Sequence, residues 1–290
     1  MSIMPPPTVP TPPPAPPAPG GQPPARRTSS LIVSIAIAVV GGLIVVGTVA
    51  GVALSTVAVA NRHQDSTAVP VAEVSALDIQ VSGGSLTVTY GSTSEAQLTV
   101  DRGFGSTPWT LENVGGTLKV ASPDHATAFG WPFGGSGTAT LTLPSSMLAS
   151  DVDGTVQVDG GSVSLEGGRF GDLRAATEAG SLRLSGSAQT VTARSDAGDS
   201  TLDLDNVTTA KLDVSAGRMV ATLGGTAPRG VDATVSAGAL DLGVPAGPYV
   251  VTSTVSAGAF HNTLGSTPGA TNAITADVSA GALTLHGSAG

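Results

Sequence analysis

The side chains that could do catalytic or metal chemistry are few in this sequence, and their types and spacing already exclude several functions. There is no cysteine, which excludes a zinc–thiolate site, a disulfide scaffold and a thiol enzyme. The four histidines have no partner at the spacing of a metal site or catalytic triad, and we predict that they are surface residues: His63, His125, His261 and His286. We therefore predict a noncatalytic protein that needs no cofactor.

Aspartates are the remaining candidates, because carboxylate oxygens are ligands that Ca²⁺ prefers. Two groups could serve: Asp151, Asp153 and Asp159, or Asp196 and Asp199. Neither group matches the glycine-rich calcium nonapeptide or the twelve-residue calcium loop. Other acids, such as those in Leu202-Asp203-Leu204-Asp205, alternate with leucines and are typical of the solvated side of a strand. We predict no metal site.

The aromatic residues cluster in one part of the chain. The sequence has only 2 Trp, 2 Tyr and 5 Phe, and five of these nine lie within residues 104–133: Phe104, Trp109, Phe129, Trp131 and Phe133. The glycines and proline of segment 128–135 predict a loop. The rings could form an interaction site for sugars, a membrane surface or a partner. Alternatively they cap the open end of a repeat core, which is the interpretation we prefer.

The elements that must position these residues come from an internal repeat. Val-Ser-Ala-Gly occurs at residues 214–217, 235–238, 255–258 and 278–281, and weaker copies precede it. From Gly161 onward the last glycine recurs with spacings of 19, 18, 19, 21, 20 and 23 residues. A period of about 20 residues is typical of a stacked repeat fold. We predict that these glycines form structural corners: Gly84, Gly161, Gly180, Gly198, Gly217, Gly238, Gly258 and Gly281.

The residues around each glycine alternate between apolar and polar with a period of two, which predicts strands. Val235 and Leu240 are five residues apart, so the chain must bend between them if both are to be buried. Glycine would supply the permissive φ of this corner. The copy at Gly198 reaches its leucine, Leu202, two residues late, which we interpret as an insertion of two residues. We predict an all-β, β-solenoid-like stack, either a wound coil or a two-sheet sandwich.

The N-terminal part has a different composition. Residues 1–30 contain 12 of the 21 prolines and predict a disordered, proline-rich cytoplasmic tail. Residues 31–60 carry no charge, and we place a transmembrane signal anchor at 31–55, a linker at 56–72 and the extracytoplasmic repeat domain at 73–290. Arg26 and Arg27 put the N-terminus in the cytoplasm. Ala58-Val59-Ala60 could instead end a cleaved signal peptide, but the apolar run is longer than a signal core.

The membrane anchor, the segment Leu141-Thr142-Leu143-Pro144 and the serial Gly-Ser-Val, Ala-Gly-Ser-Leu and Ser-Ala-Gly-Ala-Leu corners resemble the bacterial β-strand-repeat "putative adhesin" family. This family, also called toast-rack, is largely a domain of unknown function, and the proline-rich tail is similar to its membrane-anchored actinobacterial members. The resemblance covers roughly residues 74–287 and implies a cell-envelope protein. It brings no catalytic residues.

Charge and composition narrow the function further. There are 12 Lys and Arg against 21 Asp and Glu, a net charge of −9, which excludes a typical nucleic-acid binder. We expect a single-pass, noncatalytic cell-envelope module with a structural, adhesive or sensing role, whose partners are envelope glycans or other surface proteins. The alternative is a polysaccharide-acting enzyme on a β-solenoid scaffold, which needs clustered acids in a groove. The oligomeric state is left open.

Overall fold

The structure is a computed structural model that describes residues 63–102, 108–123 and 137–288. These residues form strands and one 3₁₀ helix, η2 (Ser145–Ala149). No helix within them is long and apolar enough to cross a membrane. The predicted tail at 1–30 and the predicted span at 31–55 lie outside the described residues.

The strands are β1 (His63–Pro70), β2 (Ala76–Val81), β3 (Ser85–Gly91), β4 (Glu95–Arg102), β5 (Thr110–Val114), β6 (Thr117–Ala121), β7 (Thr138–Pro144), β8 (Val152–Val158), β9 (Ser162–Thr177), β10 (Ser181–Ser195), β11 (Asp199–Asp205), β12 (Thr209–Val214), β13 (Arg218–Gly224), β14 (Gly230–Val235), β15 (Ala239–Val244), β16 (Tyr249–Val255), β17 (Ala259–Asn262), β18 (Asn272–Val278) and β19 (Ala282–Gly287).

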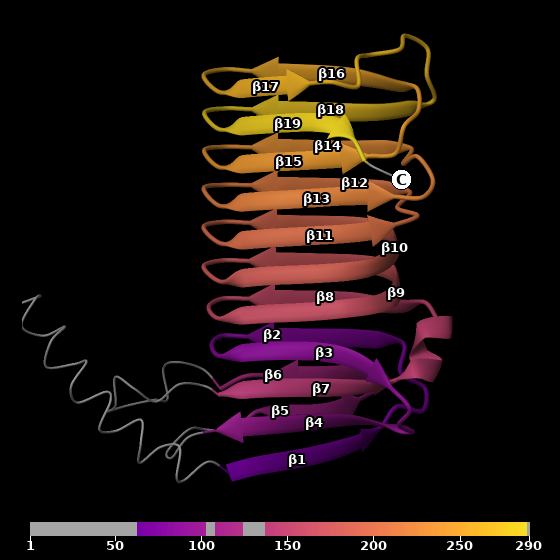
Figure 1. The fold of residues 1–290 in the computed structure, drawn as a ribbon, viewed down its shortest axis with the longest axis vertical. Helices are drawn as coiled ribbons and strands as arrows, with labels where there is room; N and C mark the ends of the chain where they lie inside the picture. Colours follow the sequence, from indigo (N-terminus) through magenta and orange to yellow (C-terminus); the bar gives the residue numbers. More distant parts are fainter. Residues whose placement is uncertain (1–62, 103–107, 124–136, 289–290) are drawn as a thin grey trace, which may run out of the picture. The chain divides into compact units, whose positions relative to one another are not determined.

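Each repeat contributes one strand to each of two facing layers, so the repeats stack as flattened turns (Figure 1). Sheet I, which contains the strands after the glycine corners, has the order β1-β4-β7-β3-β9-β10-β11-β13-β15-β19-β17. Sheet II, which contains the strands before the corners, has the order β5-β6-β2-β8-β9-β10-β12-β14-β18-β16. The long strands β9 and β10 run through both sheets. The fold is therefore a wound coil whose turns form two layers.

The predicted all-β repeat architecture is confirmed, and so is the bend at each corner. Val235 and Leu240, before and after one corner, are both buried, with 0% and 2% of their surface exposed. They belong to two columns of side chains that run through the core between the sheets. The column before the corners is Val81, Val158, Thr177, Ser195, Val214, Val235, Val278 and Val255, and the column after them is Leu86, Val163, Leu182, Ser200, Met219, Leu240, Leu283 and Phe260.

The copy at Gly198 contains no insertion, and that interpretation of the sequence is wrong. Asp199 pairs directly with Ser181 on one side and with Arg218 on the other, so the copy keeps the common register. Ser200 occupies the buried position where Leu182 stands in the preceding turn. Leu202 is at its regular position, opposite Leu184, and Ser200 takes the position that a leucine holds in the preceding turn.

The eight corner glycines form one column, and their role differs from the prediction at six of them. Only Gly84 and Gly161 have a left-handed φ, of 83° and 98°. At the others, a Cβ atom would lie less than 3.0 Å from the carbonyl oxygen of the glycine in the neighbouring turn, as at Gly180 against Gly161. That carbonyl accepts a hydrogen bond from the residue after the glycine, for example Ser181 N to Gly161 O at 2.9 Å. Glycine is required by this close approach of backbones rather than by φ.

The order of the turns in space differs from their order in the chain at both ends of the stack (Figure 1). The turn β2–β3, the first along the chain, lies between β6–β7 and β8–β9. The turn β18–β19 lies between β14–β15 and β16–β17, so that β16–β17 is outermost. In the outermost turn, Ser253 and Asn262 take the inward positions that Ala276 and Leu285 hold next to them. Polar inward residues suit an end that water can reach.

Part of the predicted linker is a strand. Residues 56–72 contain β1, which pairs with β4 in antiparallel orientation from His63↔Arg102 to Pro70↔Glu95. The segment has weak apolar alternation of its own. Its strand structure comes from the free edge of β4, which supplies backbone hydrogen-bond partners.

Candidate functional site

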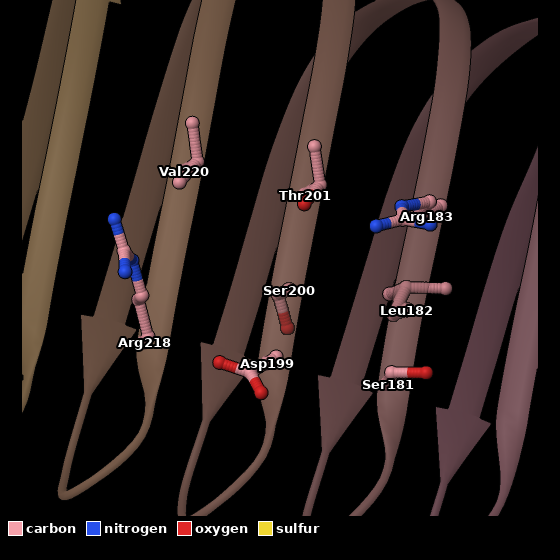
Figure 2. A pocket seen from close by; sticks show the side chains of 8 residues that line it. All are labelled: Ser181, Leu182, Arg183, Asp199, Ser200, Thr201, Arg218 and Val220. Carbon is pink, nitrogen blue, oxygen red and sulfur yellow. The ribbon is translucent and has the colours of Figure 1, made fainter.

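A shallow hollow of about 360 Å³ lies on the outer side of sheet I, over β10, β11 and β13. Figure 2 shows its side chains, with Arg183 and Arg218 on the two outer strands and Asp199 and Thr201 on the strand between them. The complete lining is Ser181, Leu182, Arg183, Asp199, Ser200, Thr201, Arg218 and Val220. Leu182 and Ser200 are buried and contribute the floor.

The strand register fixes this arrangement. Ser181, Asp199 and Arg218 stand at one level across the three strands, and Arg183, Thr201 and Val220 stand two residues further along. Residues two apart on a strand point to the same side. The alternation that buries Leu182, Ser200 and Met219 therefore turns these six side chains outward. The hollow exists because short side chains separate the two long arginines.

The two guanidinium groups of the hollow are free of partners in the part of the chain that the structure describes. Within the described part of the chain, neither Arg183 nor Arg218 has a hydrogen-bond or ion-pair partner for its guanidinium. Two other arginines, on β10 and β9, are paired: Arg194 Nη2 lies 2.7 Å from Asp196 Oδ1, and Arg169 Nη2 lies 3.1 Å from Asp151 Oδ1. The hydrogen bond from Arg194, followed by one from Ser215, lowers the pKa of the Asp196 carboxyl. The hollow is thus a place where positive charge is left available.

Towards the N-terminal end of sheet I, the outer side carries rows of hydroxyl groups. One row crosses five neighbouring strands in register: Ser66, Thr99, Thr140, Thr87 and Ser164. A second row contains Thr142 and Thr89. In a third, the hydroxyl of Ser162 donates a 2.9 Å hydrogen bond to that of Ser85. These side chains are outward because the residues between them, such as Leu86 and Leu141, are buried.

A second hollow of about 340 Å³ lies at the far end of β10 and β11. It contains the carboxylates of Asp203 and Asp205 among glycines and serines, without a basic side chain. Tyr90 lies beside its glycines, with the ring near Gly167 and Gly168. Burial raises the pKa of the Tyr90 hydroxyl to about 12.

The candidate calcium ligands do not converge. Within residues 63–102, 108–123 and 137–288, no three acids or histidines are placed to hold a metal ion. Asp153 Oδ1 accepts the backbone N–H of Asp172 at 3.0 Å, and Asp159 Oδ1 accepts a 2.8 Å hydrogen bond from Gln157. Asp151 and Asp196 pair with arginines as described above. Asp199 faces the arginine hollow instead.

One histidine has a partner that the sequence does not reveal. His286 Nε2 lies 3.0 Å from Asp241 Oδ1. The two residues are far apart in sequence, but β15 and β19 are neighbours, with Asp241 opposite Thr284 and Gly243 opposite His286. The pairing depends on the insertion of the last turn next to β15, so no local spacing could have indicated it. His261 lies on the outermost strand of sheet I.

Only one of the five clustered aromatic residues is described. Trp109 precedes β5 and is buried, with 5% of its surface exposed, as part of the apolar core. It is therefore not available as an exposed interaction residue. Phe104, Phe129, Trp131 and Phe133 lie outside the described residues. The arginine hollow, which was not predicted, is marked in sequence only by Arg183 and Arg218, in outward positions of their repeats.

No protein-family model and no curated protein matches this sequence. Among solved structures, the chain is similar to a "putative cell adhesion protein" from Clostridium sporogenes (TM-score 0.33, 8% identity, 79% of this chain and 100% of that chain). It is also similar to a "putative adhesin" from Bacteroides fragilis (TM-score 0.43, 12% identity, 78% and 97%). A third similar structure is a "putative lipid binding protein" from Parabacteroides distasonis (TM-score 0.49, 10% identity, 78% of this chain and 96% of that chain). At these identities the likeness concerns the fold alone.

Proposed function

We propose that this chain is a noncatalytic cell-envelope module that adheres to envelope glycans through the outer side of sheet I. The rows of hydroxyls on β4, β7, β3 and β9 carry this proposal. Each hydroxyl can donate one hydrogen bond and accept two, which matches the hydroxyl groups of a sugar chain. Neighbouring strands are about 4.8 Å apart, so the rows repeat regularly along the stack.

The alternative, a polysaccharide-acting enzyme, has less support. Hydrolysis of a glycosidic bond generally uses two carboxyl groups that flank the bond, one of them with a raised pKa. The arginine hollow has a single acid, Asp199, and the second hollow has two acids without a basic neighbour. A regular polar surface built by the repeat suits binding along an extended polymer better than chemistry at one bond.

Binding is tested with the full chain in detergent or nanodiscs, co-sedimented with insoluble envelope polysaccharide. The variant Thr87→Val with Thr140→Val removes two hydroxyls from the central row and retains β-branched side chains. The matched control is Thr155→Val with Thr192→Val, outward positions of sheet II. We expect the first pair to weaken binding several-fold and the second to leave it unchanged. Equal binding by both pairs contradicts the proposal.

We further propose that residues 31–55 anchor the chain, with the repeat domain outside the cell. The uncharged run and the Arg26-Arg27 flank support this topology. Protease added to intact cells should remove residues 73–290 and leave a short membrane-bound fragment. A soluble mature protein that begins near Asn61 would show a cleaved signal peptide instead.

A further inference from the structure

We infer that the hollow between Arg183 and Arg218 binds the oxyanionic groups, carboxylate or phosphate, of an acidic polymer. The inference rests on the proposed function, because it names the class of envelope polymer that sheet I would hold. It concerns residues that the hydroxyl rows do not include, and it can fail while the proposed function stands.

The first argument is the distribution of positive charge. Among the described residues that pair in the parallel part of sheet I, which includes Ser162–Leu165 of β9 and Ser181–Ser187 of β10, the only Lys or Arg residues are Arg183 and Arg218. Both lie at exposed positions and border the same hollow. The other outward charges nearby are acids, such as Asp203 and Asp241. Two basic residues on an otherwise acidic or neutral surface therefore meet at one place.

The second argument is that both guanidinium groups lack a hydrogen-bond or ion-pair partner among the residues that the structure describes. Arg169 on β9 and Arg194 on β10 have carboxylates within 3.1 Å and 2.7 Å, so their charge is neutralised locally. Arg183 and Arg218 have no such partner among the described residues. The planar guanidinium presents paired N–H groups that match a carboxylate or a phosphate in a bidentate arrangement. The free groups can each take one such anion.

The third argument is the volume of the hollow and the distance between the two strands that carry the arginines. The hollow of about 360 Å³ falls within the range of small-ligand sites, roughly 300–1,000 Å³. β10 and β13 are two strand steps apart, which puts the two backbones about 10 Å from each other. The hydroxyl of Thr201, on the strand between the arginines, and that of Ser181, on the strand of Arg183, can bind neutral parts of the ligand (Figure 2). A polymer that crosses the strands would reach both arginines in turn.

Asp199 lets the proposal predict opposite changes in anion affinity for two kinds of substitution. Its carboxylate lies in the hollow, opposite Arg218 in the strand register, and no ion pair between the two is formed within 4.0 Å. An anion that enters the hollow must approach this carboxylate and is repelled by it. Removal of the charge should therefore strengthen anion binding, whereas removal of the arginines should weaken it.

The experiment measures binding of the full chain, in nanodiscs, to oligogalacturonate as the carboxylate probe, polyphosphate as the phosphate probe and dextran as the neutral probe. The variants are Arg183→Gln with Arg218→Gln, Asp199→Asn, and the control Arg174→Gln, an exposed arginine of sheet II. We expect an affinity loss of about tenfold or more for the double variant, as for two lost charge-assisted contacts. Asp199→Asn should bind more tightly, and Arg174→Gln should match the wild type.

The three probes and the variants distinguish failure of this inference from failure of the proposed function. Tighter binding of oligogalacturonate or of polyphosphate identifies which oxyanion the hollow takes. If neither probe binds better than dextran, or if the double variant binds like the wild type or loses no more than Arg174→Gln does, the inference is overturned. Binding to envelope polysaccharide that survives in that case leaves the proposed function intact. Thermal unfolding of each variant checks that the exposed substitutions have not altered the fold.

Discussion

The hydroxyl of Ser200 donates a 3.0 Å hydrogen bond to the hydroxyl of Thr177 inside the core between the two sheets. Both side chains are buried, with 4% and 1% of their surface exposed, in columns that are otherwise apolar over most of the stack. Ser195, next to Thr177, donates its hydroxyl hydrogen to the carbonyl of Gly198 at 2.8 Å. Buried polar groups are tolerated when they pair in this way, and each costs free energy once its partner is removed.

The first prediction follows from this pair. Thr177→Val keeps the shape of the side chain but leaves the Ser200 hydroxyl without its acceptor, so it should lower the free energy of unfolding by about 1–3 kcal/mol. The double variant Thr177→Val with Ser200→Ala removes both polar partners and should recover part of that loss. Urea unfolding of the wild type, of Thr177→Val, of Ser200→Ala and of the double variant measures this. A double variant that loses the sum of the two single effects would show that the hydrogen bond does not couple them.

The second prediction concerns the glycine column. In Gly238→Ala the new Cβ would meet the carbonyl oxygen of Gly217 and a methyl group of Val214, so we expect a loss of about 1–3 kcal/mol from overpacking. Gly230→Ala is the control, because a Cβ at Gly230 meets no atom within 4 Å and its φ is not left-handed. Melting temperatures compare the two. Similar values for both variants would count against close backbone approach as the reason for glycine.

The third prediction locates the end of the stack. Val235 and Val255 occupy the same core column, but Val235 is fully buried, whereas 43% of Val255 is exposed because no turn among the described residues covers it. Val235→Asp should abolish or severely reduce folding, since it buries an unpaired charge. Val255→Asp should be tolerated with a loss below about 1 kcal/mol, as for an ordinary surface change. A severe effect at Val255 would mean that another segment or a second chain covers this end.

The fourth prediction concerns Trp109. In the Trp131→Phe background its fluorescence should be blue-shifted and resistant to quenchers, because the ring is packed in the core. Trp109→Ala should cost roughly 3–5 kcal/mol, the usual range for a buried tryptophan. Quenching as efficient as that of free tryptophan would contradict the burial of this ring.

The fifth prediction is a dependence on alkaline pH. The folded-state pKa of Tyr90 is about 12, above the unfolded value of 10.0, because burial disfavours the tyrosinate. The unfolded chain therefore loses this proton first, and the contribution of Tyr90 to stability, complete below pH 10, is lost as the pH rises towards 12. Tyr90→Phe should flatten this part of the curve of unfolding free energy against pH. Tyr249→Phe is a useful comparison, since burial raises the pKa of Tyr249 as well. Tyrosinate absorbance measured in the folded protein checks the ionisation directly.

Local patterns in the sequence determined the strands, the corners and the repeat. The alternation around Leu240 and Leu242 specifies which side is buried, and the recurrent glycine marks every turn from Gly161 to Gly281. These features are readable because each copy makes nearly the same contacts with its neighbours, so the pattern is repeated in the chain. The absence of cysteine and the acidic balance likewise limit the chemistry without any knowledge of the fold.

Only the tertiary structure decided which turns are neighbours and what their side chains meet. The polar inward residues Ser253 and Asn262 suit an end turn, but they do not specify that residues 249–262 lie outside the later turn 272–287, because any free sheet edge offers the same backbone hydrogen bonds. That order brings His286 to Asp241. Likewise Ser200 looks like a displaced leucine until Thr177 is found beside it, and Arg183 and Arg218 look unrelated until strand pairing sets them two strands apart. Such contacts depend on packing between distant segments, which local periodicity does not encode.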